Sequence, residues 1–183
     1  ITAQPGNNGT KPTSAYTSSG GRIAIHQSIA RDFSEFPKSR ILASRNLAAA
    51  CGTVYLQSAD KKRGADLYIE TGKSSDYDTA FPMSEDGDAS TCYKHVNLII
   101  GNGGRVKVSR GTGNIPQTIT VRSLSLASPS ARLDLNANFI TVIDPEWKRG
   151  KDWSPNATLE SGTYNRVNGK ITYLSRGTLI LVR

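Results

Sequence analysis

The sequence has few of the residues that build metal centres and catalytic sets. It contains two cysteines and two histidines in 183 residues, and the cysteines fit neither a Cys-x-x-Cys nor a Cys/His zinc pattern. A Gly-x-Ser-x-Gly motif is absent, and Gly101–Gly104 separates two alternating runs without opening a helix, which argues against a phosphate loop. His26 and His95 lie on or beside predicted strands, which favours structural or surface roles. We assign no catalytic residue and no cofactor, with calcium as the one ion considered below.

Long hydrophobic runs and aromatic residues are also scarce. No apolar run approaches the roughly 18 residues of a membrane span, so we predict no spanning segment. The hydrophobic fraction is 37%, the aromatic fraction is 7% and the mean hydropathy is -0.40. These values are low for a globular enzyme. They suit a narrow solenoid, whose strands each face solvent on one side.

Acidic residues are outnumbered by basic ones. The chain has 23 Lys and Arg against 15 Asp and Glu, which gives a net charge of +8. The basic residues are dispersed, the longest run is Lys61-Lys62-Arg63, and no RNA- or DNA-binding signature is present. We therefore expect no nucleic-acid partner. An anionic polysaccharide or cell surface fits the charge, and a dispersed solvated surface is the alternative.

The sequence does contain a series of short alternating runs between His95 and Asp144. Apolar and polar residues alternate in 96–100, 105–109, 118–122, 123–126 and 132–135. Period two is the strand signal, because successive side chains point to opposite faces of a strand. Gly101–Gly104, Gly111–Asn114 and Ser128–Ser130 separate the runs and supply the residues that turns require. The stretch predicts an all-β fold.

Two all-β architectures can use such runs, a right-handed parallel β-helix (β-solenoid) and a β-sandwich. Leu98, Ile119 and Ile140 are each 21 residues apart, about one turn of a solenoid, so we predict that they form one column. Inward parity changes between Val121 and Leu124 without hairpin residues, as at a solenoid corner. We predict the solenoid, with the sandwich as the alternative. The predicted core is Ile23, Val54, Leu67, Leu98, Ile119, Leu124, Leu133 and Ile140.

Four motifs combine glycine corners with alternating strands. They are SGGRIAI (19–25), GTVYLQ (52–57), GADLYIETGK (64–73) and TVRSLSLASPSARLDLNANFITV (120–142). Together they resemble a β-helix module of large secreted surface proteins from Verrucomicrobia, Lentisphaerae and Planctomycetes. The resemblance implies a right-handed parallel β-helix and a bacterial extracellular or cell-surface location. Its motifs specify a fold, and no catalytic residue is carried over from it.

We divide the chain into two parts. Residues 1–20, rich in Gly, Asn, Thr and Ser, are predicted to be a loop or a segment that adds to a neighbour's sheet. Residues 21–183 are predicted to form the solenoid, with an acidic insertion at about 74–94. The last run, Gly177–Arg183, is apolar and has no polar cap after it. We therefore expect head-to-tail self-association, or neighbouring domains in a longer chain.

The insertion contains five carboxylates in an otherwise basic chain. Calcium binds several oxygen ligands on a flexible loop, so these residues are candidate calcium ligands. Their spacing is neither that of an EF-hand nor that of a Gly-Gly-x-Gly-x-Asp repeat. A solvated acidic loop, or one that pairs with a neighbouring subunit, is the alternative interpretation. The candidate ligands are Asp76, Asp78, Glu85, Asp86 and Asp88.

Two further groups are candidates for binding and for a disulfide. Trp147 and Trp153 can stack on sugar rings while Asp152 bonds to hydroxyls, although both Trp can instead cover an open end of the solenoid. Cys51 and Cys92 each precede an apolar strand, so equivalent positions on neighbouring turns predict a disulfide. Two buried free thiols are the alternative.

These features predict a secreted or cell-surface structural or adhesive β-solenoid. A carbohydrate-binding module is the first alternative. A lyase or hydrolase acting on an acidic polysaccharide is the second, because basic residues can serve as a base and neutralise a uronate. We favour a role without catalysis.

Overall fold

The computed structural model describes residues 21–27, 41, 43, 50–59, 64–70, 78–81, 93–143, 163–165 and 169–173. Twelve strands and one short 3-10 turn, η2 (Thr112–Asn114), are described, and no α-helix is present among these residues. The strands are β1 (Arg22–His26), β2 (Thr53–Gln57), β3 (Ala65–Ile69), β4 (Thr79–Phe81), β5 (Val96–Ile100), β6 (Arg105–Val108), β7 (Thr118–Val121), β8 (Ser123–Leu126), β9 (Arg132–Asp134), β10 (Phe139–Val142), β11 (Thr163–Asn165) and β12 (Lys170–Tyr173).

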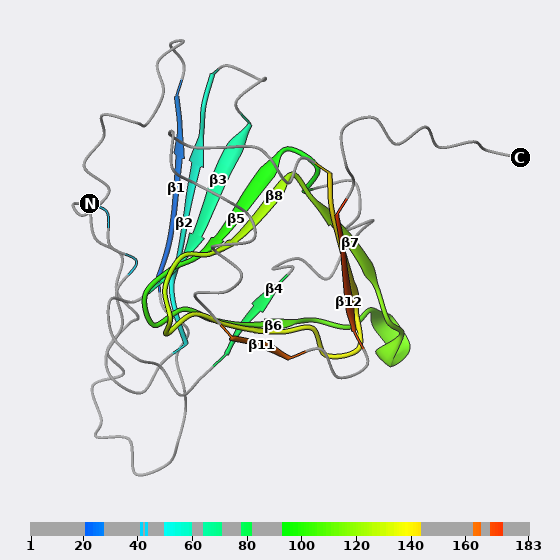
Figure 1. The fold of residues 1–183 in the computed structure, drawn as a ribbon. Coiled ribbons are helices and arrows are strands. Elements are labelled where there is room, and N and C mark those ends of the chain that lie inside the picture. Colours follow the sequence, from blue (N-terminus) through cyan, green and yellow to red (C-terminus); the bar gives the residue numbers. More distant parts are fainter. Residues whose placement is uncertain are drawn as a thin grey trace, which may run out of the picture.

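The strands form three sheets that make the sides of a triangular coil (Figure 1). Sheet 1 has the order β1-β2-β3-β5-β8, sheet 2 the order β11-β9-β6-β4, and sheet 3 the order β12-β10-β7. The chain visits sheets 1, 2 and 3 in turn, since β5, β6 and β7 make one turn and β8, β9 and β10 make the next. The β-solenoid prediction is confirmed, and the sandwich alternative is wrong.

Among the described strands, all pairs are parallel except β2 and β3, which are antiparallel. The parallel pairs join successive turns of the coil. The antiparallel pair adds β2, and β1 beyond it, to the side of β3. Sheet 1 therefore extends past the first turn of the coil, while sheets 2 and 3 have no described strand beside β1 and β2.

Register places apolar side chains in columns inside the coil. In sheet 1, Leu98 pairs with Leu67 on one side and with Leu124 on the other. In sheet 3, Ile140 pairs with Ile119 and with Ile171. The predicted column of Leu98, Ile119 and Ile140 is therefore wrong in its first member, which lies in another sheet. The turns differ in length because their corners differ, so one fixed period cannot locate a column.

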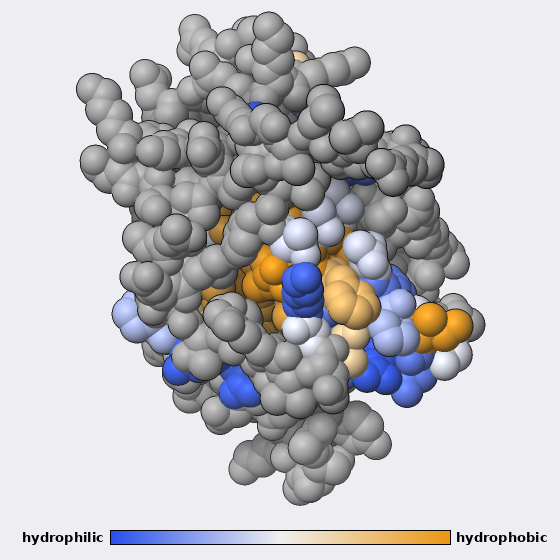
Figure 2. Space-filling model, turned by 45° about the vertical axis from the view of Figure 1, so that its right-hand side comes forward, coloured by the Kyte–Doolittle hydropathy of each residue, from blue (hydrophilic) through white to orange (hydrophobic). Residues whose placement is uncertain are grey.

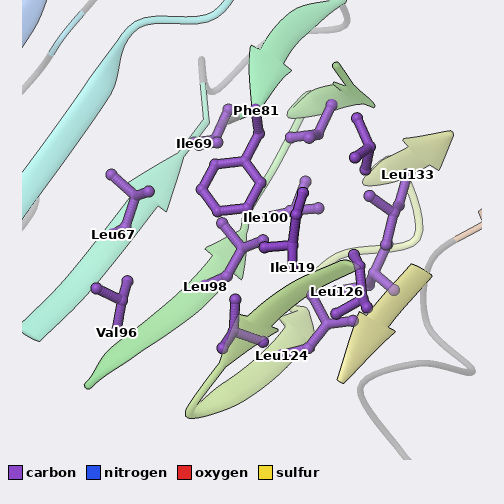
Figure 3. Packing of buried hydrophobic residues seen from close by; sticks show 14 of the residues in the cluster. Leu67, Ile69, Phe81, Val96, Leu98, Ile100, Ile119, Leu124, Leu126 and Leu133 are labelled. Atoms are coloured by element: carbon purple, nitrogen blue, oxygen red, sulfur yellow. The ribbon is translucent and has the colours of Figure 1, made fainter. Parts of the chain in front are cut away.

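The interior of the coil is a continuous apolar core (Figure 3). Side chains from the three sheets point toward one another there, and Phe81 packs among Ile69, Ile100 and their neighbours. Such burial is the main stabilising term for a narrow coil. All eight predicted core residues are buried, and six of them lie in this cluster: Leu67, Leu98, Ile119, Leu124, Leu133 and Ile140.

Ile23 and Val54 belong to a second apolar cluster outside the coil. They pack with Ile41, Ala43, Leu56 and Tyr68. Tyr68 pairs with Val54, and Ile23 pairs with Val54, so these residues share the outward face of sheet 1. Their assignment to the solenoid interior was therefore wrong, although their burial was predicted correctly. Alternation predicts that one face of a strand is buried and leaves open which core it joins.

The glycine corner between β5 and β6 lies where the sequence predicts it. The Gly101 N–H donates to the carbonyl of Ile69, and that of Gly104 donates to Gly101, at 3.0 Å each. Gly103 has a φ of 69°, in the left-handed region that favours glycine. A Cβ on Gly104 would collide with the Ile69 carbonyl oxygen. Glycine is therefore required at the corner for both backbone conformation and close approach.

A second corner, between β9 and β10, carries no glycine. Asn136 and Ala137 both have positive φ, at 48° and 63°. Asn138 is fully buried, and its Nδ2 donates to the carbonyls of Val108 and Leu135 at 3.2 and 2.9 Å. Its Oδ1 accepts from the Gln117 N–H at 2.8 Å. The side chain of one asparagine thus ties this corner to the preceding turn, which offsets the strain of the corner.

The sheet 3 to sheet 1 corner is the shortest. Only Arg122 separates β7 from β8, although these strands belong to different sheets. Val121 and Leu124 both point into the core. The predicted change of parity at this point is confirmed.

The remaining segment predictions fall only partly on described residues. Thr79–Phe81 lies within the predicted acidic insertion yet forms β4, which pairs with β6 and places Phe81 in the core. Residues 1–20 and Gly177–Arg183 lie outside the described residues. No helix in the described part of the chain is long and apolar enough to cross a membrane.

Candidate binding face

The predicted calcium ligands are described at one position. Asp78 Oδ1 accepts a hydrogen bond from Arg105 Nε at 3.0 Å, which forms an ion pair at the surface. Asp76, Glu85, Asp86 and Asp88 lie outside the described residues. Within the described ranges, no three His, Cys, Asp or Glu side chains gather as metal ligands would. The calcium site stays a prediction.

The predicted sugar-binding residues Trp147, Trp153 and Asp152 also lie outside the described residues, as does Cys92. Cys51 is described and is buried in the coil core. Its Sγ is 3.4 Å from the Gly103 carbonyl oxygen, at the corner described above. The disulfide therefore stays a prediction.

The outward side of sheet 1 contains polar groups, but they are buried. Asp66, Asn97 and Ser123 stand in register on β3, β5 and β8. Asn97 Nδ2 donates to Asp66 Oδ1, and Ser123 Oγ donates to Asn97 Oδ1, each at 2.9 Å. The Tyr68 hydroxyl donates to Asp66 Oδ2 at 3.2 Å. A buried network of this kind stabilises the stack and offers no ligand surface.

The outward side of sheet 2 is charged, and several of its groups bond within the fold. Arg132 Nη1 donates to the carbonyls of Pro129 and Ala131 at 2.6 and 2.9 Å. Asp134 Oδ1 accepts from the Asn136 N–H at 2.9 Å. Arg105 pairs with Asp78 as described above. Lys107 stands between these groups as an exposed side chain. Most polar side chains on this side are therefore hydrogen-bonded to other groups of the fold, chiefly at its corners.

The outward side of sheet 3 differs from both. We call it the threonine face, and it consists of two columns. Thr120, Thr141 and Thr172 stand in register in one, and Thr118, Phe139 and Lys170 stand in register in the other. Neighbouring strands lie about 4.8 Å apart, so the hydroxyls recur along the coil at that spacing.

Each strand of the threonine face repeats one local pattern. The strands read TITV, FITV and KITY, with the isoleucine inward and the following threonine outward. Threonine favours strands because its branched side chain packs well on a pleated surface. Its hydroxyl remains able to donate and accept. The same residue thus builds the sheet and supplies a polar outer surface.

Apolar and basic side chains complete this face. Phe139 is 43% exposed, which is unusual for a phenylalanine, and Lys170 is exposed beside it in register. Ile115 and Ile143, before β7 and after β10, are also exposed. In Figure 2, which turns the right-hand side of Figure 1 forward, the coloured surface mixes near-neutral and apolar residues with hydrophilic ones. The threonine face contains no carboxylate.

A smaller group lies on β1 and β2, where sheet 1 extends past the coil. His26 Nδ1 and Gln57 Oε1 are 2.6 Å apart, and the rings of His26 and Tyr55 have centroids 5.7 Å apart. Partial burial raises the pKa of the Tyr55 hydroxyl through desolvation. Arg22 and Ala24 share this face of β1, and both are exposed. The group is a small, partly exposed surface of two strands.

Comparison with protein-family models, with curated proteins and with solved structures finds no match for this chain. The threonine face was not predicted from the sequence. Its signal is the recurring pair Ile-Thr in TITV, FITV and KITY, at 119, 140 and 171. Because the intervals are unequal, a search for one repeat length misses it.

Proposed function

We propose that this chain is a secreted or cell-surface structural protein that adheres to an acidic polysaccharide through the threonine face. The observation that carries the proposal is the composition of that face. Threonine hydroxyls, an exposed Phe139 and the cation of Lys170 stand in register on a parallel sheet. The outward side of sheet 1 is buried and that of sheet 2 is bonded within the fold.

The chemistry of an acidic sugar polymer matches these groups. A sugar ring has an apolar face that can stack on Phe139, and hydroxyls that can exchange hydrogen bonds with Thr141 and Thr172. Its carboxylate can pair with Lys170, and the net charge of +8 favours an anionic partner at longer range. Because the face repeats from strand to strand along the coil, it suits an extended polymer better than a compact ligand.

Binding of galacturonic acid oligomers, measured by isothermal titration calorimetry, tests this proposal. We expect Phe139→Ala to weaken binding about tenfold, the loss of about 1.4 kcal/mol of contact. Lys170→Ala should weaken binding most at low salt, because exposed ion pairs are screened. Thr141→Val removes a hydroxyl with little change of shape and should also reduce affinity.

Lys107→Ala is the matched control, since it removes the same charge from the outward side of sheet 2. Equal losses from Lys107→Ala and Lys170→Ala would reduce the interaction to non-specific charge attraction and would contradict a binding face. Absence of binding to a panel of acidic and neutral glycans would overturn the proposal. The same mixtures should be examined for unsaturated products, whose appearance would show a lyase instead.

The extracellular part of the proposal includes a disulfide between Cys51 and Cys92. Thr79 Oγ1 donates to the Cys51 carbonyl at 3.0 Å, and Phe81, two residues later, contacts Tyr93 with ring centroids 4.8 Å apart. Tyr93 directly follows Cys92 in the sequence. These contacts span sheet 1, since Cys51 lies beside Gly103 after β5 and Tyr93 precedes β5, so the disulfide follows from the proposed location, where disulfides persist, and not from proximity.

Mass spectrometry after alkylation without reduction measures the bond directly. We expect no alkylated cysteine before reduction and two afterwards. Two alkylated cysteines in the unreduced, denatured protein would contradict the disulfide. That outcome would also weaken the proposed location, while leaving polysaccharide binding to its own test.

A further inference from the structure

The outermost strand of sheet 1, β1, has a free edge among the described residues. It pairs with β2 on one side, and no described strand lies on the other. The Thr53 N–H donates to the Gly21 carbonyl, and the Gln27 N–H donates to the Gln57 carbonyl. In a parallel ladder, bonding groups alternate along a strand, so 21, 23, 25 and 27 bond toward β2. The backbone groups of Arg22, Ala24 and His26 therefore point to the free edge.

This edge carries one charged residue, Arg22, and lacks the other usual devices that prevent pairing. It contains no proline and no bulge, and it pairs with β2 in regular register over all five residues. The side chains of Arg22, Ala24 and His26 lie on the exposed face of the strand. None of them is a charged residue that points into the core at the edge. An edge of this kind is a template for another strand.

We propose that the free edge of β1 binds β1 of a second copy of this chain, antiparallel about a two-fold axis. Centring the axis on Ala24 places Ala24 opposite its symmetry mate and Arg22 opposite His26 of the second copy. In that register the three residues whose backbone groups point outward all become hydrogen-bonded pairs. A centre at Ile23 would leave His26 without a partner inside the strand, so the Ala24 register uses the edge most fully.

The side chains agree with the same register. Ile23 falls opposite Ile25 of the second copy, which extends the outer apolar cluster from one copy into the other. Ala24, the smallest side chain of the strand, lies at the axis opposite its own symmetry mate, so no bulky pair meets at the centre of the contact. The contact is isologous, so it closes as a dimer, unlike the head-to-tail contact expected from the sequence. It does not depend on polysaccharide binding.

Cysteine cross-linking tests both the contact and its register. Hydrogen-bonded antiparallel pairs have Cα atoms about 5.5 Å apart, which lies within disulfide range. We expect Ala24→Cys to form a covalent dimer on mild oxidation, and Arg22→Cys as a single variant to form none. The double variant Arg22→Cys, His26→Cys should cross-link again. The unaltered protein is the control for the native cysteines.

Sedimentation equilibrium of Ala24→Pro provides a second measurement. Proline removes an outward N–H without removing a bond to β2, and edge strands tolerate it. Loss of the backbone hydrogen bonds between Ala24 and its symmetry mate should raise the dimer dissociation constant at least about tenfold. Circular dichroism should show that the monomer remains folded.

Hydrogen exchange distinguishes the remaining occupants of the edge. Amides of Ala24 and His26 should become protected only as protein concentration rises. A monomer at every concentration would overturn the proposal, whether these amides exchange freely or are protected by another part of the same chain. Cross-linking of Arg22→Cys without Ala24→Cys would overturn the register.

Discussion

The two ends of sheet 1 differ in whether their inward face is buried. On β3, β5 and β8, the residues Leu67, Leu98 and Leu124 point into the coil and are fully buried. Their counterparts on β1 and β2, Ala24 and Tyr55, are exposed and half-buried. The outward face is buried at both ends, with Asn97 and Ser123 on β5 and β8 and with Ile23 and Val54 on β1 and β2. One continuous sheet thus serves two cores.

This difference in burial of the inward face arises because the coil ends at β3. Beside β3, β5 and β8, sheets 2 and 3 close the interior, so the inward face is removed from water on all sides. Beside β1 and β2 no described strand faces the sheet from within. Ile41 and Ala43 instead pack on the outward face. Burial follows whichever partner is present, and alternation along the strand merely allows either outcome.

Leu98→Ala should show the largest effect, because it empties the centre of the inward column. We expect a loss of about 3 to 4 kcal/mol in the free energy of unfolding, from lost burial and the cavity that remains. Urea denaturation measures it. Ile115→Ala, at a 63% exposed site, should change stability by less than about 0.5 kcal/mol. Similar losses in the two variants would show that the coil interior is not the dominant core.

Asn97→Ala should cost less, about 2 kcal/mol, because it leaves buried polar partners unsatisfied on the outward side. Asp66 Oδ1 loses its donor and Ser123 Oγ loses its acceptor. Thermal unfolding compared with Thr118→Ala, an exposed threonine, checks the expectation. An unchanged melting temperature would mean that the polar ladder contributes nothing to the stack.

Ile23→Ala should have the smallest global effect, about 1 to 2 kcal/mol, because the outer cluster lies at the edge of the sheet and can partly collapse. Its effect on the local opening of β1 and β2 should be larger. Hydrogen exchange should accelerate in 22–27 and 53–57 while 96–100 keeps its protection. Equal acceleration in all three segments would show that the two cores unfold as one unit.

Some features of the fold followed directly from short segments of sequence. The strands at 96–100, 118–121 and 123–126 were predicted by alternation, and the corner at Gly101–Gly104 by its glycines. The corner at Asn136–Asn138 was not, because positive φ at Ala137 has no sequence signal and is stabilised by bonds from Asn138 to the preceding turn. The threonine face was missed for a related reason, since unequal corners disguise its repeat.

Alternation and turn residues were enough to predict an all-β protein, many of its buried side chains and the glycine corner after β5, because these depend on residues close together in the chain. The pairing of the strands became known from the folded coil. That pairing separated Leu98 from Ile119, sent Ile23 and Val54 to a second core, and aligned three threonines from turns of different length. Strand pairing depends on the length of the corners and on which surfaces pack together. The residues of a single strand specify neither of these.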